Sequence, residues 1–388
     1  MSEAFIIEAL RTPGGRARKG GLIGVHPADL GATVLNALVK RTGIDPAAVE
    51  DVIVGCVTQG GEQAFAFGRN LVLASNLPDS VPAVTIDRQC GSSQQALHFA
   101  AQAVMSGTQD VVIAAGSESM TRVPMNSSWQ LHRAAGIGAG PWSRAILDRY
   151  GVAEFSQFHG AQAIADKYGF TREEMDAFAL ESHAKAAAAI DCGAFRDEII
   201  PVVAPDGRIF DTDDGVRRGG TMEQMAAVKC LAEGGTITAA NASQMTDGAS
   251  GALIVSEAAL KHFNLTPLAR IANLTVTAGD PVIMLEEPIP ATRKALARSG
   301  IKLEDIDLFE VNEAFAAIPM AWLRAIGADP ARLNVNGGAI ALGHPLGASG
   351  TKLMATLVHA LKARGGRYGL QTMCEGGGVA NVTIVERI

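Results

Sequence analysis

Long basic tracts and long apolar runs are both missing from this chain of 388 residues. Its formal net charge is −7 at pH 7, whereas a nucleic-acid-binding surface needs clustered lysine and arginine. No segment approaches the roughly 20 consecutive apolar residues that cross a bilayer. The first residues, MSEAFIIEALRTPGG, lack the basic start and the apolar stretch of a secretory signal. We therefore expect a soluble, cytoplasmic protein that binds neither nucleic acid nor membrane.

Cysteine is sparse and irregularly spaced. The number of cysteines is odd, and no two of them form a C-x-x-C pair or a Cys/His metal-binding pattern. This spacing argues against a disulfide framework and against a structural zinc site, and we expect no metal. In a reducing compartment each free thiol belongs either to the core or to the chemistry of the protein. The five are Cys56, Cys90, Cys192, Cys230 and Cys374.

The composition supports a large folded core. Hydrophobic residues make up 48% of the chain, which is too apolar for disorder, and the length predicts two or three domains. Residues 28–43 and 92–107 have the apolar spacing of helices, with Asp29 as a candidate N-cap of the first. Residues 49–57 and 110–117 have the pattern of buried strands. This alternation predicts an α/β fold with a largely parallel sheet covered by helices.

The second half of the chain repeats the first at a constant offset of 257 residues. Gly43 corresponds to Gly300 and Ser117 to Cys374, and the apolar stripes of two predicted helices coincide at the same offset. We interpret this register as two copies of one α/β unit.

The segment between the copies differs from both of them. It contains a long predicted helix that opens with a capping box formed by Thr171 and Glu174. We therefore predict three parts: residues 1–119 plus 246–268 as the N-terminal half, 120–245 as a covering loop domain, and 269–388 as the C-terminal half.

Four short stretches combine residues that can carry chemistry. Cys90 lies just before a helix, where the partial positive charge of the helix N-terminus favours a thiolate. His344 lies in a glycine-rich loop and can act as a base toward a thiol. Cys374 precedes three glycines, whose bare backbone N–H groups can stabilise an oxyanion. Asn312 and Glu313 follow an apolar strand, where a polar pair must find partners.

Each stretch alone also has a structural explanation: a space-filling cysteine, a structural histidine, a tight turn, or a solvated strand end. The repeat favours the chemical interpretation. Loops at the carboxyl ends of strands build the active sites of α/β proteins, and the repeat can bring Cys90, His344 and Cys374 to one such edge.

Taken in order, the four stretches resemble the motifs of the thiolase family (acetyl-CoA acyltransferases), and the resemblance covers essentially the whole chain. The motifs are CGSSQQA with Cys90, NEAFAA at 312–317, NGGAIALGHPLGASG with His344, and CEGGG with Cys374. The resemblance implies the thiolase fold, in which two repeated α/β halves form an αβαβα layered arrangement with a covering loop domain.

The resemblance also implies acyl transfer in two steps, with acyl-CoA and CoA as substrates and no metal or redox cofactor. Cys90 attacks the 3-keto carbon of a 3-oxoacyl-CoA, and His344 helps to form the attacking thiolate. Cys374 protonates the departing acetyl-CoA carbanion and later takes the thiol proton of the incoming CoA. One oxyanion hole combines His344 with a water held by Asn312, and the other combines the backbone N–H groups of Cys90 and Gly376.

Supporting and binding residues follow from the same resemblance. Glu313 is implied to orient the histidine or its neighbours. The family's CoA contacts fall on Arg217, Gln224 and Ser243, and its acyl-pocket positions fall on Met284, Ala314 and Phe315. Thiolases usually form homodimers or homotetramers, and we expect one of these states.

Departures from the pattern bear on substrate preference. Residues 156–158 stand where short-chain biosynthetic thiolases carry His-Met-Gly, with His159 adjacent as a candidate substrate contact. Asp87 stands where asparagine is usual, and Ser93 where glycine is common. We therefore expect a degradative 3-ketoacyl-CoA thiolase of the β-oxidation type. The alternatives are a biosynthetic acetoacetyl-CoA thiolase, a thiolase-fold condensing enzyme, a cysteine hydrolase, and a silent CoA- or lipid-binding protein.

Overall fold

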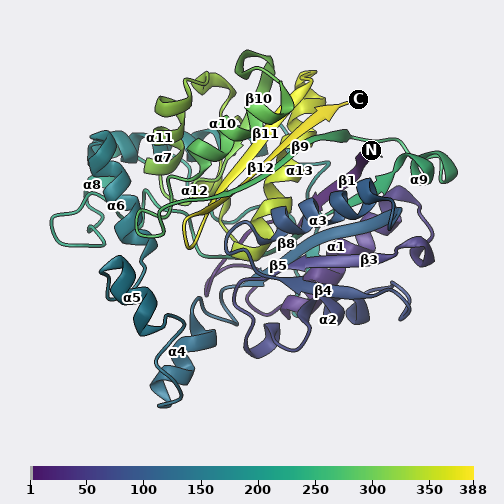
Figure 1. Cartoon of the computed structure of the whole chain (residues 1–388), viewed down its shortest axis with the longest axis horizontal. Helices are drawn as coiled ribbons and strands as arrows, with labels where there is room; N and C mark the ends of the chain where they lie inside the picture. Colours follow the sequence, from purple (N-terminus) through teal and green to yellow (C-terminus); the bar gives the residue numbers. More distant parts are fainter. Residues whose placement is uncertain (1–2) are drawn as a thin grey trace.

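The core of the protein is one mixed β-sheet that runs through both halves of the chain, as a computed structural model of residues 3–388 shows (Figure 1). Its strands are β1 (Ala4–Arg11), β2 (Gly15–Arg16), β3 (Asp51–Gly55), β4 (Ala83–Ile86), β5 (Val111–Ser119), β8 (Thr246–Ser256), β9 (Ala269–Ala278), β10 (Ile306–Val311), β11 (Tyr368–Glu375) and β12 (Val379–Arg387). The main path has the order β10-β11-β12-β9-β1-β8-β5-β3-β4. A short pairing of β1 with β9, at Phe5 and Ile6, joins the two halves.

Strand directions correct the expectation of a largely parallel sheet. β3 runs parallel to β4 and β5, and β10 runs parallel to β11. The pairs β1–β8, β5–β8, β11–β12, β9–β12 and β1–β9 are antiparallel. Only residues 376–378 connect β11 to β12, and so short a connection cannot carry the chain back for a parallel pairing.

The helices of the two halves confirm the repeat. They are α1 (Pro27–Thr42), α2 (Phe67–Ala74), α3 (Ser92–Ser106) and α9 (Glu257–His262) in the first half, and α10 (Pro288–Ser299), α11 (Ala317–Ile326), α12 (Ala339–Leu342) and α13 (Ser349–Arg364) in the second. α3 and α13 begin 257 residues apart, as do β5 and β11. Gly43 and Gly300 end α1 and α10 with left-handed φ angles of 67° and 70°.

One predicted cap is wrong. His26, not Asp29, is the N-cap of α1, and its Nδ1 accepts from the Ala28 N–H at 3.2 Å. Asp29 lies in the first turn of the helix, where a negative charge still favours the helix dipole.

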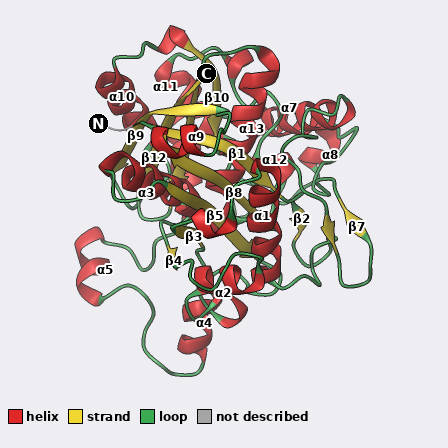
Figure 2. Cartoon of the chain, turned by 90° about the vertical axis from the view of Figure 1, so that its right-hand side faces the viewer, coloured by secondary structure: helices red, strands yellow, loops and turns green. Residues whose placement is uncertain are grey.

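Helices alternate with the two parts of the sheet (Figures 1 and 2). α1 and α2 pack on the outer face of the first half, and α10 packs on β9 and β12 of the second. α3 and α13 lie between the halves and contact each other, and each also contacts strands of both halves. This is the predicted αβαβα arrangement.

The covering segment contributes α4 (Ser127–Ala134), α5 (Arg144–Tyr150), α6 (Gln157–Tyr168), α7 (Arg172–Asp191), α8 (Met222–Ala226) and the small β6–β7 pair (Val202–Val203 and Ile209–Phe210). α6 packs on α11 and α7 on α12, whereas both cartoons show α4 and α5 away from the sheet. The Thr171–Glu174 capping box of α7 is present as predicted. The division into three parts stays a prediction. No helix in residues 3–388 is long and apolar enough to cross a bilayer.

Glycines allow the two halves to touch backbone to backbone. A Cβ built on Gly350, in the first turn of α13, would lie 2.0 Å from the backbone nitrogen of Gln94 in α3. A Cβ on Gly347 would lie 2.6 Å from the Cα of Cys56, at the end of β3. Such distances leave no room for a side chain, so the contact between the halves requires glycine at both positions.

We expect Gly350→Ala to destabilise the protein by about 1–3 kcal/mol or more, because the added methyl group must push backbone atoms apart. Thermal and urea unfolding would measure the change. Gly24→Ala is a matched control, since the nearest atom to its new Cβ is a Pro205 side-chain carbon at an ordinary 3.5 Å. Equal stability of the two variants would contradict this account of the contact.

Candidate active site

The carboxyl ends of β10 and β11 lie side by side because the two strands pair in parallel. Val311 pairs with Thr372, and the backbone N–H of Asn312 donates to the Thr372 carbonyl at 3.1 Å. Asn312 and Cys374 therefore reach the same edge of the sheet. The side-chain oxygen of Asn312 is buried and has no hydrogen-bond partner among the described residues, so it needs a donor such as a bound water.

Cys90 lies in the turn between β4 and α3, and this turn contacts the end of β11. A Cβ on Gly91 would lie 2.0 Å from Oε1 of Glu375, so the two segments touch at a glycine. Burial, followed by the charges of Cys90 and Glu375, raises the pKa of Cys374. The structure thus brings together one cysteine from each half.

His344 lies in the loop between α12 and α13 and is held from several sides. Its Nε2 is 3.4 Å from Nδ2 of Asn312, and its Nδ1 is 2.5 Å from Oγ of Ser349. Its backbone N–H donates to the Gln244 carbonyl at 3.0 Å and to Oγ1 of Thr246 at 3.1 Å. Sequence reasoning missed Ser349, although a serine that opens a helix five residues after the histidine was a visible signal.

The imidazole of His344 is neutral. Burial, followed by the positive charge of Lys352, lowers its pKa to about 3. The Ser349 hydroxyl donates to the Pro345 carbonyl at 2.9 Å and therefore accepts from the histidine. This assigns the ring proton to Nδ1 and leaves the lone pair of Nε2 facing Asn312.

The thiol of Cys90 rests protonated although it lies just before a helix. Burial raises the pKa of its thiol to about 12, and the Glu375 carboxylate adds to this effect. α3 begins at Ser92, two residues after Cys90. The positive end of the helix favours the thiolate, but burial has the larger effect on the pKa and favours the thiol. Burial also raises the pKa of Cys374 well above its usual value. Both thiols rest protonated, so Cys90 needs a base.

Glu313 does not contact the histidine ring. Its carboxylate accepts from Oγ of Ser182 at 2.6 Å, from Nδ2 of Asn334 at 2.9 Å and from the Ile340 N–H at 3.2 Å. It therefore holds the segment that leads to α12 and on to His344. Of the two roles predicted for Glu313, this geometry supports only contact with the neighbours of the histidine.

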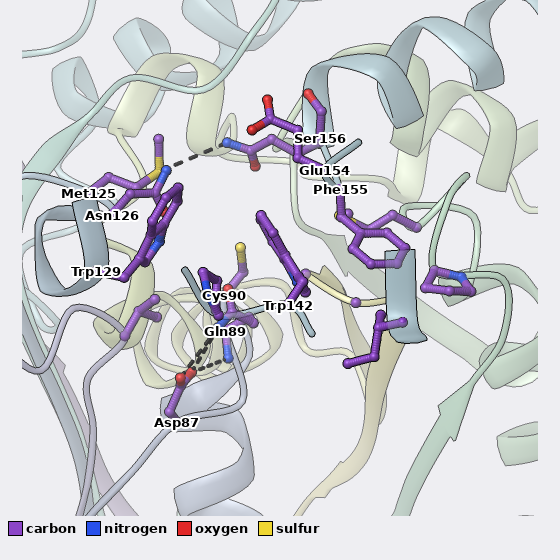
Figure 3. Close-up of a pocket in the computed structure, with 18 of the residues that line it drawn as sticks. Asp87, Gln89, Cys90, Met125, Asn126, Trp129, Trp142, Glu154, Phe155 and Ser156 are labelled. Carbon is purple, nitrogen blue, oxygen red and sulfur yellow. Dashed lines mark hydrogen bonds between the residues drawn. The ribbon is translucent and has the colours of Figure 1, made fainter. Parts of the chain in front are cut away.

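A cavity of about 1080 Å³ opens above Cys90 (Figure 3). Cys90, Gly376 and Met284 line it, whereas His344, Asn312 and Cys374 lie outside its lining. Residues 156–158 of the covering segment line it too. Much of the remaining wall is apolar or aromatic: Met125, Trp129, Trp142, Ile146, Tyr150, Phe155 and Leu346.

The other predicted binding residues lie behind or outside this cavity. Ala314 and Phe315 are buried, and the Phe315 ring contacts that of Phe158, which does line the cavity. The backbone N–H of Ser243 donates to the Ala314 carbonyl at 2.9 Å.

Three further candidates have no contact with the cavity. Gln224 forms a capping box with Thr221, which occupies its side-chain oxygen. Arg217 and His159 are exposed and absent from the lining, because the first lies in a surface loop and the second on the outer side of α6. Their contacts with CoA stay predictions.

The site combines a protonated thiol, a neutral imidazole whose Nε2 lone pair faces Asn312, and a second protonated thiol. Within residues 3–388 no group of three or more His, Cys, Asp or Glu side chains is arranged to bind a metal ion. The fold and these groups define an enzyme that transfers acyl groups through cysteine.

Comparison with known proteins identifies the family. Residues 4–258 match the N-terminal domain of thiolase and residues 265–387 match its C-terminal domain. The chain therefore belongs to the thiolase family and is an acyltransferase, which confirms the resemblance found in the sequence.

Relatives match over nearly their full length. The chain is 53% identical to the steroid 3-ketoacyl-CoA thiolase FadA6 of Mycobacterium tuberculosis, over 100% of this chain and 95% of the relative. It is 42% identical to the acetyl-CoA acetyltransferase of Pseudomonas aeruginosa, over 97% and 98% of the two chains. It is 39% identical to the 3-ketoacyl-CoA thiolase of Bacillus subtilis, over 100% of both.

We expect Ser349→Ala to lower kcat by about 10- to 100-fold, because it leaves Nδ1 of His344 without its buried partner. Steady-state kinetics with a 3-oxoacyl-CoA and CoA would measure the loss. Ser106→Ala, an exposed serine in α3, should keep wild-type kcat. A Ser349→Ala enzyme as active as Ser106→Ala would show that the serine does not orient the histidine.

Proposed function

We propose that this protein cleaves 3-oxoacyl-CoA with CoA to give acetyl-CoA and a shortened acyl-CoA, in a degradative role. The observation that supports the proposal is that Cys374 and Asn312 reach one edge of the sheet, where His344 lies 3.4 Å from Asn312 and the turn that carries Cys90 contacts Glu375. A cysteine hydrolase or a ketoacyl-type condensing enzyme has no use for the second thiol. Two relatives, one 53% and one 39% identical to this chain, are named as 3-ketoacyl-CoA thiolases.

In the first step Cys90 is the nucleophile. His344 accepts its proton at Nε2, and the sulfur attacks the 3-keto carbon. Backbone N–H groups of Cys90 and Gly376 stabilise the resulting oxyanion. The bond between carbons 2 and 3 then breaks, and the electron pair passes to the acetyl-CoA enolate. The imidazolium of His344 and a water on Asn312 stabilise that enolate, and Cys374 protonates its carbon.

In the second step the acyl group leaves Cys90. A CoA thiol enters and gives its proton to the Cys374 thiolate, which restores the second thiol. The CoA sulfur attacks the thioester carbonyl, and the Cys90 thiolate departs as the shortened acyl-CoA forms. The proton held by His344 returns to Cys90, so atoms and charges balance over the cycle.

We expect wild-type enzyme incubated with acetyl-CoA to gain one acetyl group on Cys90, visible by peptide mass spectrometry. Cys374→Ala should lower carbon–carbon cleavage by about 100-fold or more, the usual contribution of a positioned proton donor. Cys192→Ala removes an exposed thiol outside the site and should keep wild-type activity. Cleavage by Cys374→Ala near the wild-type rate, or no adduct on Cys90, would exclude a thiolase mechanism.

We further propose that the acyl group is bulky and carries rings. The chain has three tryptophans, and two of them, Trp129 and Trp142, line the cavity that Cys90 also lines. Their ring centroids are 5.8 Å apart, and Phe155 lies 5.7 Å from Trp142 (Figure 3). Aromatic faces favour flat apolar partners. The relative named a steroid 3-ketoacyl-CoA thiolase supports the same substrate class.

A substrate series tests this class, from acetoacetyl-CoA through longer fatty 3-oxoacyl-CoAs to one ring-bearing substrate. We expect kcat/KM to be highest for the ring-bearing substrate, and Trp142→Ala to lower it there by about tenfold with little change for acetoacetyl-CoA. Leu131→Ala in α4, which is exposed and outside the lining, is the control. A preference for acetoacetyl-CoA would instead favour the biosynthetic alternative.

Two assignments remain predictions from the sequence and the family alone. These are the homodimeric or homotetrameric state and the cytoplasmic location. Acyl-CoA and CoA as partners, with no further cofactor, agree with the chemistry proposed above.

A further inference from the structure

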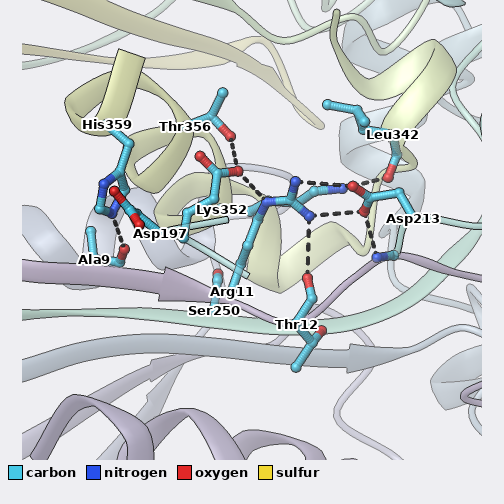
Figure 4. A network of polar contacts seen from close by, with 12 residues as sticks. Ala9, Arg11, Thr12, Asp197, Asp213, Ser250, Leu342, Lys352, Thr356 and His359 are labelled. Carbon is cyan, nitrogen blue, oxygen red and sulfur yellow. Dashed lines mark hydrogen bonds and ion pairs between the residues drawn. The ribbon is translucent and has the colours of Figure 1, made fainter. Parts of the chain in front are cut away.

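A buried cluster of charges lies beneath the histidine loop (Figure 4). Arg11 is fully buried and pairs with Glu198 at 2.5 Å and with Asp213 at 2.8 Å. Lys352, from α13, is only 4% exposed. The cluster holds two cations and two anions, and burying these charges has a cost that must be offset by good geometry. Arg11 pairs with both carboxylates, so the role of Lys352 in this cluster must lie elsewhere.

Lys352 makes its hydrogen bonds to backbone, not to the carboxylates. Its Nζ donates to the Leu342 carbonyl at 2.5 Å and to the Gly343 carbonyl at 2.9 Å. Among residues 3–388 no carboxylate lies close enough to its Nζ to form an ion pair, whereas Arg11 pairs with two carboxylates. Those two carbonyls belong to the residues immediately before His344. The buried ammonium of Lys352 therefore binds the backbone that leads directly to His344.

The same backbone is constrained from its other side. Gly343 has a φ of 82°, and a Cβ there would lie 2.1 Å from Oγ1 of Thr246. Lys352 and Ser349 are three residues apart on α13, so they share one face of that helix. Ser349 fixes the ring of His344, and Lys352 fixes the peptide groups that precede it.

We propose that Lys352 is a positioning residue for His344, and that it holds the Leu342 and Gly343 carbonyls so that the imidazole faces Asn312. The proposal rests on the function proposed above, in which His344 is the base. Loss of the ammonium would leave two buried carbonyls without a donor and free the loop to move. A displacement of about 1 Å at a catalytic group can cost about 100-fold in rate.

The charge of Lys352 also favours the neutral form of His344. Burial lowers the pKa of Lys352 to about 8, opposed by the charge of Asp213, so the side chain is charged at neutral pH. The groups that face it are Arg11 from β1 and the carboxylates of Glu198 and Asp213 from the covering segment.

The decisive variant is Lys352→Met, which keeps roughly the length of the side chain and removes the charge and both hydrogen bonds. We expect kcat to fall by about 100-fold with KM nearly unchanged, because the interaction serves the transition state and not substrate binding. Lys352→Arg keeps the charge and the donors, and it should exceed the kcat of Lys352→Met by about tenfold. Lys362→Met, an exposed lysine on the same helix, should match the wild type.

A second readout does not depend on the natural substrate. Alkylation of Cys90 by iodoacetamide, followed by peptide mass spectrometry, reports how well the histidine accepts the thiol proton. Lys352→Met should slow this alkylation toward the rate of His344→Ala, at a temperature where thermal melts show both variants folded. Wild-type alkylation and kcat in folded Lys352→Met would overturn the proposal, as would a loss that Lys352→Arg does not reverse.

The two readouts separate the proposals. Failure of the wild type to cleave 3-oxoacyl-CoA would refute the proposed function. Slow alkylation in Lys352→Met would even then support the positioning role.

Discussion

The active site depends on close backbone contact between two halves of one chain. The nucleophile comes from the first half and the histidine from the second, so any separation of the halves pulls the reacting groups apart. Gly347 and Gly350 permit the approach because neither has room for a Cβ. The buried carboxylate of Glu118 adds a direct link, since it accepts from the N–H groups of Val57 in the cavity wall and Gly347 in the histidine loop. Packing of the halves and assembly of the site are therefore the same event.

Burial sets the chemical state of every reacting group at once. It raises the pKa of both thiols and lowers that of His344, so all three rest uncharged. Charge appears only during reaction, when the imidazole accepts a proton and oxygen atoms become negative. In a site of low dielectric constant, fixed donors then act with more effect than in water. The buried oxygen of Asn312, with no described partner, is suited to hold one such donor in the form of a water.

The sequence alone predicted the features that depend on local chain pattern. The offset of 257 residues located the paired helices and strands, and positive-φ glycines ended helices where expected. The sequence pattern did not predict contacts between segments that are far apart in the chain. Ser349 and Lys352 are ordinary residues of a helix until folding places the loop of His344 against them. The size of the pKa shift of Cys90 was beyond prediction for a related reason. Burial depends on every segment that covers the residue, whereas the helix N-terminus that favours a thiolate is visible in the local sequence.

The reacting groups and the wall of the cavity come from different parts of the fold. Strand ends and the α3–α13 contact fix the thiols and the histidine, whereas the wall of the cavity comes largely from residues 125–158 of the covering segment. α4 and α5 lie away from the sheet, so a side chain there can change without disturbing the central packing. This separation is consistent with relatives that match the whole chain yet are named for different acyl groups, acetyl in one and steroid in another. A rigid catalytic edge under a variable cover lets one mechanism serve substrates of very different size.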